Sequence, residues 1–89
     1  MMYPFMTLED DSEIVHSHVF DEDGVKKVFV HFERPTEEVY DSARCELPSY
    51  KWISREGFTD EEIGMFEKIV QSNAHLFYEY AELGGIDIA

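Results

Sequence analysis

Two segments with a period of two, joined by an Asp-Gly pair, constrain this chain most. Residues 14–20 and 27–32 both read as half-buried β-strands. Between them, Asp23 and Gly24 favour the positive φ angles of a two-residue type I′ turn. A turn at this point pairs residue 20 with 27, residue 18 with 29 and residue 16 with 31. The sequence therefore predicts an antiparallel hairpin.

This register divides the hairpin into two faces. The face that we expect to enter the core carries Val15, Ser17, Val19, Val28, Val30 and Phe32. The other face carries Ile14, His16, His18, Phe20, Lys27, Phe29, His31 and Glu33. This second face is more apolar than a solvated sheet face requires, so we predict an interaction face at Ile14, Phe20, Phe29 and His31. A second copy of the chain is the preferred cover for it, although the net charge opposes that pairing.

Two further segments extend the predicted sheet on either side of the hairpin. An earlier strand is expected over residues 5–8, and a two-residue turn at 10–11 places Met6 opposite Val15, with Met6 and Leu8 in the core. A fourth strand is expected over residues 42–47 and ends at Pro48. Its core face carries Ala43, Cys45 and Leu47. One end of the core is expected to be closed by Tyr50, Trp52 and Ile53.

The last third of the chain predicts one long helix. The segment from Thr59 to Glu62 is a capping box, and Phe58 before it can pack onto Ile63. The apolar stripe consists of Ile63, Phe66, Ile69, Val70, Leu76, Phe77, Tyr80, Ala81 and Leu83. Asn73 falls inside this stripe, so a break near residues 72–73 is the alternative to one continuous helix. The pair Gly84-Gly85 ends the segment.

Together these elements predict a single α+β domain over residues 1–89. Its fold is a four-stranded antiparallel β-meander (ββββα), with the sheet at about residues 3–53 and one amphipathic helix at about residues 59–83 packed on one sheet face. The 44% of hydrophobic residues is typical of a folded chain rather than a disordered acidic tail.

The net charge of -13 excludes one class of function. Nucleic acids are bound by clustered cations, whereas the seven Lys and Arg residues here are scattered among twenty carboxylates. The charge itself has two interpretations, which are solubility and the attraction of a basic protein partner. Six of the seven basic residues lie between Lys26 and Arg55, while eight acids from Glu56 onward accompany Lys68 alone. This asymmetry favours a directional interaction through the helix.

A single cysteine limits the redox chemistry and the compartment. Cys45 has no partner for an intramolecular disulfide and is predicted to pack in the core, which is typical of a reducing compartment. No apolar run approaches the ~20 residues of a membrane span, and the N-terminus lacks the features of a secretory signal. We therefore expect a cytoplasmic protein.

Three strand histidines form the candidate metal site. The predicted register brings His16, His18 and His31 together, and Glu33 could supply a fourth ligand for zinc or another divalent metal. The alternative is a patch of packed rings without metal. A pairing of Val30 with Cys45 would also place Arg44 opposite His31, and a fixed cation there opposes metal binding.

No catalytic motif is present in the sequence. Cys45 is predicted to lie away from the histidines, and there is no glycine-flanked serine or phosphate-binding loop. We therefore predict a small acidic cytoplasmic interaction or regulatory module, without catalysis or cofactor, that binds another protein, including a basic one. The alternatives are a metal-binding protein that uses the strand histidines and an acidic nucleic-acid mimic that inhibits a basic protein.

Overall fold

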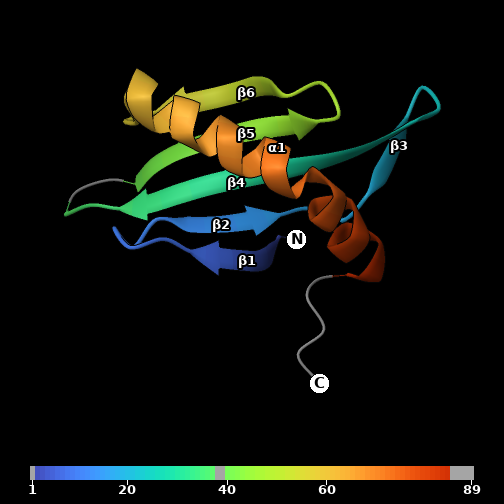
Figure 1. Ribbon diagram of the computed structural model, residues 1–89, viewed down its shortest axis with the longest axis horizontal. Helices are drawn as coiled ribbons and strands as arrows, with labels where there is room; N and C mark the ends of the chain where they lie inside the picture. Colours follow the sequence, from blue (N-terminus) through green and yellow to red (C-terminus); the bar gives the residue numbers. More distant parts are fainter. Residues whose placement is uncertain (1, 38–39, 85–89) are drawn as a thin grey trace.

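The computed structural model describes residues 2–37 and 40–84 and shows an α+β fold. One antiparallel sheet of six strands is followed by a C-terminal helix that lies across it (Figure 1). The elements are β1 (Tyr3–Thr7), β2 (Glu13–His16), β3 (Phe20–Glu22), β4 (Val25–Pro35), β5 (Tyr40–Leu47), β6 (Lys51–Glu56) and α1 (Asp60–Leu83). The strand order is β1-β2-β4-β5-β6, and β3 also pairs with β4. The class is as predicted, but the sheet has two more strands than expected.

The tip of the β3–β4 hairpin confirms the predicted turn. Asp23 and Gly24 have φ angles of 53° and 79°, in the left-handed region that a type I′ turn needs. Phe20 pairs with Lys27 and Glu22 pairs with Val25, as the turn predicts. The Asp-Gly pair therefore fixes the register of the first residues on either side of it.

Further from the turn, the register differs from the prediction by one residue. His16 pairs with Val30 rather than with His31, and His31 pairs with Val15. The change occurs at Ser17, whose Oγ accepts the N–H of Phe29 at 3.0 Å in place of a backbone carbonyl. A shift by one residue moves every side chain of β2 to the opposite face of the sheet.

This shift corrects the predicted faces of β2. Ile14 and His16 are fully buried in the core, whereas Val15 and Ser17, which we expected there, are only half-buried. Val28, Val30 and Phe32 of β4 are fully buried, as predicted. Val19 is partly buried and packs against the core.

The β1 strand also lies in a different register from the expected one. Met6 pairs with Ile14 instead of Val15, after an irregularity between Pro4 and Met6. Met6 is 46% exposed, so its predicted place in the core is wrong, while Leu8 packs against the core as expected. The register differs from the prediction because Leu8 donates its N–H to the Ser12 carbonyl, which closes a longer loop than the expected two-residue turn.

The strands on the other side of β4 are β5 and β6. Val30 pairs with Cys45, as the sequence suggested, and β5 ends at Leu47. The sequence pattern predicts no separate strand at β6, yet β6 pairs with β5. Of the three residues expected to close the core, Tyr50 and Trp52 pack against it, whereas Ile53 is 48% exposed beside the irregularity in this pairing.

The helix begins and ends where the sequence predicts. Thr59 is its N-cap: its Oγ1 accepts the N–H of Glu62 at 3.2 Å, and Glu62 Oε1 accepts the N–H of Thr59 at 3.0 Å. The helix continues through Asn73, whose side chain donates to the carbonyl of Ile69 at 2.8 Å. Gly84 follows with a φ angle of 81°, while Gly85 lies outside the described residues.

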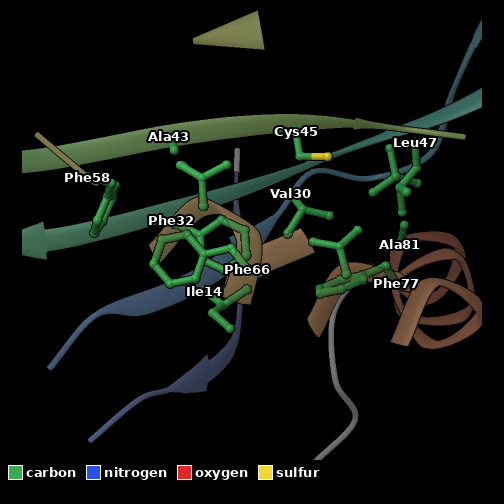
Figure 2. Packing of buried hydrophobic residues seen from close by; sticks show 13 residues of the cluster. Ile14, Val30, Phe32, Ala43, Cys45, Leu47, Phe58, Phe66, Phe77 and Ala81 are labelled. Atoms are coloured by element: carbon green, nitrogen blue, oxygen red, sulfur yellow. The ribbon is translucent and has the colours of Figure 1, made fainter. Parts of the chain in front are cut away.

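The core lies between α1 and one face of the sheet, which we call the covered face (Figure 2). The ring of Phe66 stacks on Phe32 with centroids 4.2 Å apart and meets the edge of Phe58 at 4.9 Å. The other buried apolar residues are Ile14, Val28, Val30, Ala43, Cys45, Leu47, Ile63, Val70, Phe77 and Ala81. Burying each large side chain contributes roughly 1.5–3 kcal/mol. This one layer of side chains holds the helix on the sheet.

Candidate functional site

The three candidate metal ligands do not converge. His16 lies on the covered face, where its ring packs against Tyr3 and Phe77. His31 lies on the opposite face, because it pairs with Val15. Within residues 2–37 and 40–84, no group of three or more His, Cys, Asp or Glu side chains could hold a metal ion. The predicted pairing of His16 with His31 is therefore wrong, and the metal hypothesis loses its ligand geometry.

Each histidine has a different local environment. The Nδ1 of His16 donates to the carbonyl of Ser17 at 2.8 Å, which leaves the buried Nε2 as an acceptor without a partner. His18 is exposed, and its Nδ1 is 3.2 Å from the hydroxyl of Tyr3. The Nε2 of His31 donates to Glu33 at 3.0 Å. None of these contacts needs a metal.

The sheet face opposite α1 is not covered by any helix of the described residues, and we call it the uncovered face. Pairing and the alternation of side chains assign to it Glu13, Val15, Phe20, Glu22, Val25, Lys27, Phe29, His31, Glu33, Pro35, Tyr40, Ser42, Arg44, Glu46, Lys51, Ser54 and Glu56. It includes three of the four residues of the predicted interaction face. The fourth, Ile14, was placed there wrongly, because the register shift at Ser17 turns it into the core.

Rings occupy the middle of the uncovered face. Phe20 and Phe29 lie with their centroids 5.0 Å apart, and the guanidinium of Arg44 is 5.3 Å from the centroid of the Phe29 ring. Val15 and His31 lie beside them and, like the two phenylalanines, are half-buried. These side chains therefore shield one another only in part.

His31 shows how the middle of this face differs from bulk solvent. Burial lowers the pKa of His31, and the nearby Arg44 lowers it further, while Glu33 acts in the opposite direction. The Nδ1 atom is also buried without a hydrogen-bond partner. The neutral imidazole is thus the favoured form on this face.

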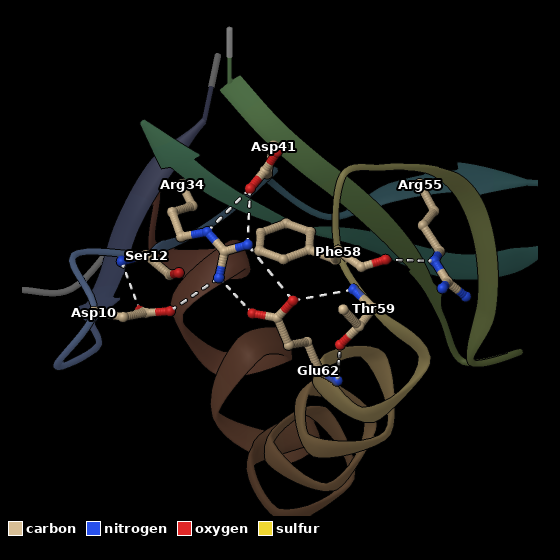
Figure 3. Close-up of polar contacts among 8 residues, drawn as sticks. All are labelled: Asp10, Ser12, Arg34, Asp41, Arg55, Phe58, Thr59 and Glu62. Carbon is tan, nitrogen blue, oxygen red and sulfur yellow. Dashed lines mark hydrogen bonds and ion pairs between the residues drawn. The ribbon is translucent and has the colours of Figure 1, made fainter. Parts of the chain in front are cut away.

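A cluster of acidic side chains surrounds Arg34 at the border of the covered face. Its Nε and Nη2 donate to Asp41 at 3.0 and 2.8 Å, and its Nη1 donates to Asp10 at 3.3 Å and to Glu62 (Figure 3). The guanidinium also lies 4.8 Å from the centroid of the Phe58 ring. These contacts join the β1–β2 loop, β4, β5 and the first turn of α1. The hydrogen bond from Arg34, with that from the Thr59 backbone, lowers the pKa of Glu62.

A shallow groove lies between the β1–β2 loop and α1. Its volume is about 350 Å³, and it is lined by Leu8, Glu9, Asp10, Met65 and Ile69. Met65 on the helix is 48% exposed. The sequence did not reveal this groove, because a loop and a helix far apart in the chain form it together.

The carboxylates near the groove are largely free of cations. Glu9 lines it, Asp11 stands at the tip of the same loop, and Glu61 precedes Met65 by one helical turn. None of these three forms an ion pair within the described part of the chain. The α1 segment as a whole carries six carboxylates and one cation, Lys68. The groove is therefore apolar at its floor and acidic around it.

Cys45 is not a nucleophile in this fold. It is fully buried, and burial, with a smaller effect of Glu67 and Glu46, raises the pKa of its thiol to about 12. The thiol therefore stays protonated at neutral pH and acts as a small apolar side chain.

Comparisons with known proteins supply no site that could be transferred to this chain. Comparisons with protein-family models, with curated proteins and with solved structures give no match. Among the described residues, no helix combines the length and the apolar character needed to cross a membrane. The groove and the uncovered face are therefore the two surfaces from which a function can be inferred.

Proposed function

We propose that this chain is a small, non-catalytic interaction module of the cytoplasm that binds a basic segment of another protein. The observation that carries the proposal is the groove between the β1–β2 loop and α1, with its apolar floor and its acidic surroundings. A buried free thiol at Cys45 is compatible with a reducing compartment.

The floor of the groove supports an apolar anchor. Leu8 and Ile69 are partly buried, and Met65 exposes nearly half of its surface. Methionine adapts to differently shaped apolar partners because its side chain is unbranched and polarizable. An aliphatic or aromatic side chain of the partner would cover these three residues and gain the usual stabilisation of apolar burial.

The surrounding charge supports a basic partner. Carboxylates dominate both the loop and the helix, so positively charged segments are attracted from a distance and negatively charged ones are repelled. Among residues 2–37 and 40–84, no cation pairs with Glu9, Asp11 or Glu61, so a Lys or Arg from the partner would not have to displace one. Charge would thus select the partner, and the apolar floor would fix its position.

Affinity capture with three baits tests this proposal. The wild type is compared with Met65→Arg, which fills the groove and adds a cation, and with Val25→Arg, a matched control at the start of β4 on the side of the sheet opposite the groove. The two substituted side chains are similarly exposed, at 48% and 43%. We expect basic proteins to bind the wild type and the control, to elute with salt, and to be lost from Met65→Arg.

The same experiment separates the alternatives. If all three baits retain the same proteins, the groove is not the binding site. If added DNA displaces the captured protein, the module occupies a nucleic-acid-binding surface, which would favour the nucleic-acid mimic. If no basic protein is retained by the wild type, the acidic surface serves solubility alone.

A further inference from the structure

The charges on the uncovered face are arranged in rows along the strands. At one end, Glu13 pairs with Glu33, and the row continues through Ser42 to Glu56, so this row carries no cation. The middle row contains Val15, His31, Arg44 and Ser54. The next row contains Phe29, Glu46 and Lys51, and Lys27 lies two residues beyond Phe29. The face is thus purely acidic at one end and ring-rich in the middle, and at the other end Lys27 and Lys51 stand beside Glu22 and Glu46.

The lysines and the acidic row lie far enough apart that their charges screen one another little and can each interact with a separate charge of a partner. Six residues of β4 separate Lys27 from Glu33, which corresponds to roughly 20 Å along the strand. That distance exceeds the Debye length of about 8 Å at physiological salt. Lys27 already contacts Glu22 at 2.9 Å and Glu46 at 3.5 Å, whereas Lys51 is exposed and forms no ion pair in the described part of the chain.

We infer that the uncovered face binds the uncovered face of a second copy, with the strands of the two sheets antiparallel. A two-fold axis that lies in the interface and runs across the strands places β4 over β4 and β6 over β6 of the second copy. With the axis between the rows of Phe29 and His31, Lys27 faces Glu33 of the second copy, and Lys51 faces Ser54, which neighbours Glu56 on the same face of β6. The rings of the two middle rows face one another between sheets that pack about 10 Å apart.

Charge selects this orientation over the other face-to-face arrangement. A two-fold axis along the strands would place the row of Glu13, Glu33 and Glu56 over the same row of the second copy, and like charges would repel. The antiparallel arrangement replaces that repulsion by two sets of opposite charges. Each copy still carries -13, so long-range repulsion opposes the dimer and makes it sensitive to protein concentration and salt.

This interface leaves the proposed groove free. Met65 and Leu8 lie on the helix side of the sheet, and the second copy would cover only the opposite side. The dimer is therefore independent of the proposed function, and each can fail without the other.

Charge reversal on β6 tests the dimer directly. Sedimentation velocity is recorded at physiological salt over a wide range of protein concentrations, for the wild type, Lys51→Glu, Glu56→Lys and the double variant. We expect a reversible dimer that each single reversal weakens about tenfold, because each dimer contains the pair twice. The double variant should recover wild-type association, since it restores opposite charges at both sites.

Lys68→Glu is the matched control, because it changes the net charge as Lys51→Glu does but lies on the helix. Both lysines are exposed, so neither substitution removes a packed side chain. We expect Lys68→Glu to associate like the wild type. The inference is wrong if the wild type stays monomeric at every concentration, if both Lys→Glu variants weaken association equally, or if the double variant remains as weak as the single ones.

Discussion

The two faces of the sheet share the same strands but differ in how their side chains are held. On the covered face, Phe32 is fully buried and stacks on Phe66 of the helix. On the uncovered face, the equally large Phe29 is half-buried and packs against Phe20 and a cation, Arg44. One helix of 24 residues can cover only one side of this sheet. The chain itself therefore completes the covered face, while the uncovered face retains apolar surface that another molecule can cover.

The largest contrast should appear when one phenylalanine is removed from each side. We expect Phe66→Ala to destabilise the fold by about 3–5 kcal/mol, because it leaves a cavity between fully buried rings. Phe29→Ala should cost about 1 kcal/mol in the dilute protein, because its ring is only half-buried. Denaturant unfolding measures both. Equal losses would show that the uncovered face is as well packed as the core.

The register of β2 shows where the sequence stops determining the structure. The Asp-Gly turn correctly predicts the pairing of Phe20 with Lys27. Extending the same pairing to His16 gives the wrong register, because the N–H of Phe29 donates to the hydroxyl of Ser17 instead of to a backbone carbonyl. Both faces of β2 contain one aliphatic residue, Ile14 or Val15, so hydrophobic alternation cannot choose between the two registers.

The lack of a local sequence pattern also explains why β6 and the groove between the β1–β2 loop and α1 were not predicted. The β6 strand contains an irregularity near Ile53 and lies at the sheet edge, so it lacks the alternation that reveals a strand. The helix, in contrast, is fixed locally by its capping box and was predicted to within one residue of its start. The groove forms where Leu8 and Met65, which are far apart in the sequence, line the same hollow, and no local pattern in the sequence indicates this.

Two arginines allow a second comparison of the faces. Arg34 donates to three carboxylates, and Asp41 among them exposes only 14% of its side chain. We expect Arg34→Ala to cost about 2–3 kcal/mol, because it leaves partly buried carboxylates without a partner. Arg44→Ala should cost less than about 1 kcal/mol, since it loses a cation–π contact with Phe29. Thermal unfolding of both variants in dilute solution checks this, and a larger loss for Arg44 would reverse the assignment.

Loss of the helix cap should have a smaller effect on the covered side. Thr59→Ala removes the acceptor for the N–H of Glu62 and is expected to lower the free energy of unfolding by about 1 kcal/mol. Thr7→Ala in β1 is the control, because Thr7 is exposed, and it should change stability by less than about 0.5 kcal/mol. If the denaturation midpoint is unchanged in Thr59→Ala, the cap does not support the helix.

The smallest expected effect is a pH dependence that differs between the two faces. Burial holds the pKa of His31 below its ordinary value of 6.5, so the unfolded chain takes up the proton first and stability falls as the pH drops below about 6.5. A separate loss follows below about 4.5, the ordinary value of Glu62, whose pKa Arg34 lowers. We expect His31→Gln to remove the first decline and keep the second. Unfolding curves across this pH range test it, and an unchanged first decline would show that another group titrates there.

Hydroxyl-radical footprinting at two protein concentrations tests most directly whether a second copy covers the uncovered face and leaves the groove exposed. The labelling of Phe20 and Phe29 reports on the uncovered face, and that of Met65 on the groove. We expect strong labelling of both phenylalanines in dilute protein and clear protection in concentrated protein, with equal labelling of Met65 in the two samples. If Phe29 labels equally at both concentrations, or if protection appears at Met65 instead, the uncovered face is not where two copies meet.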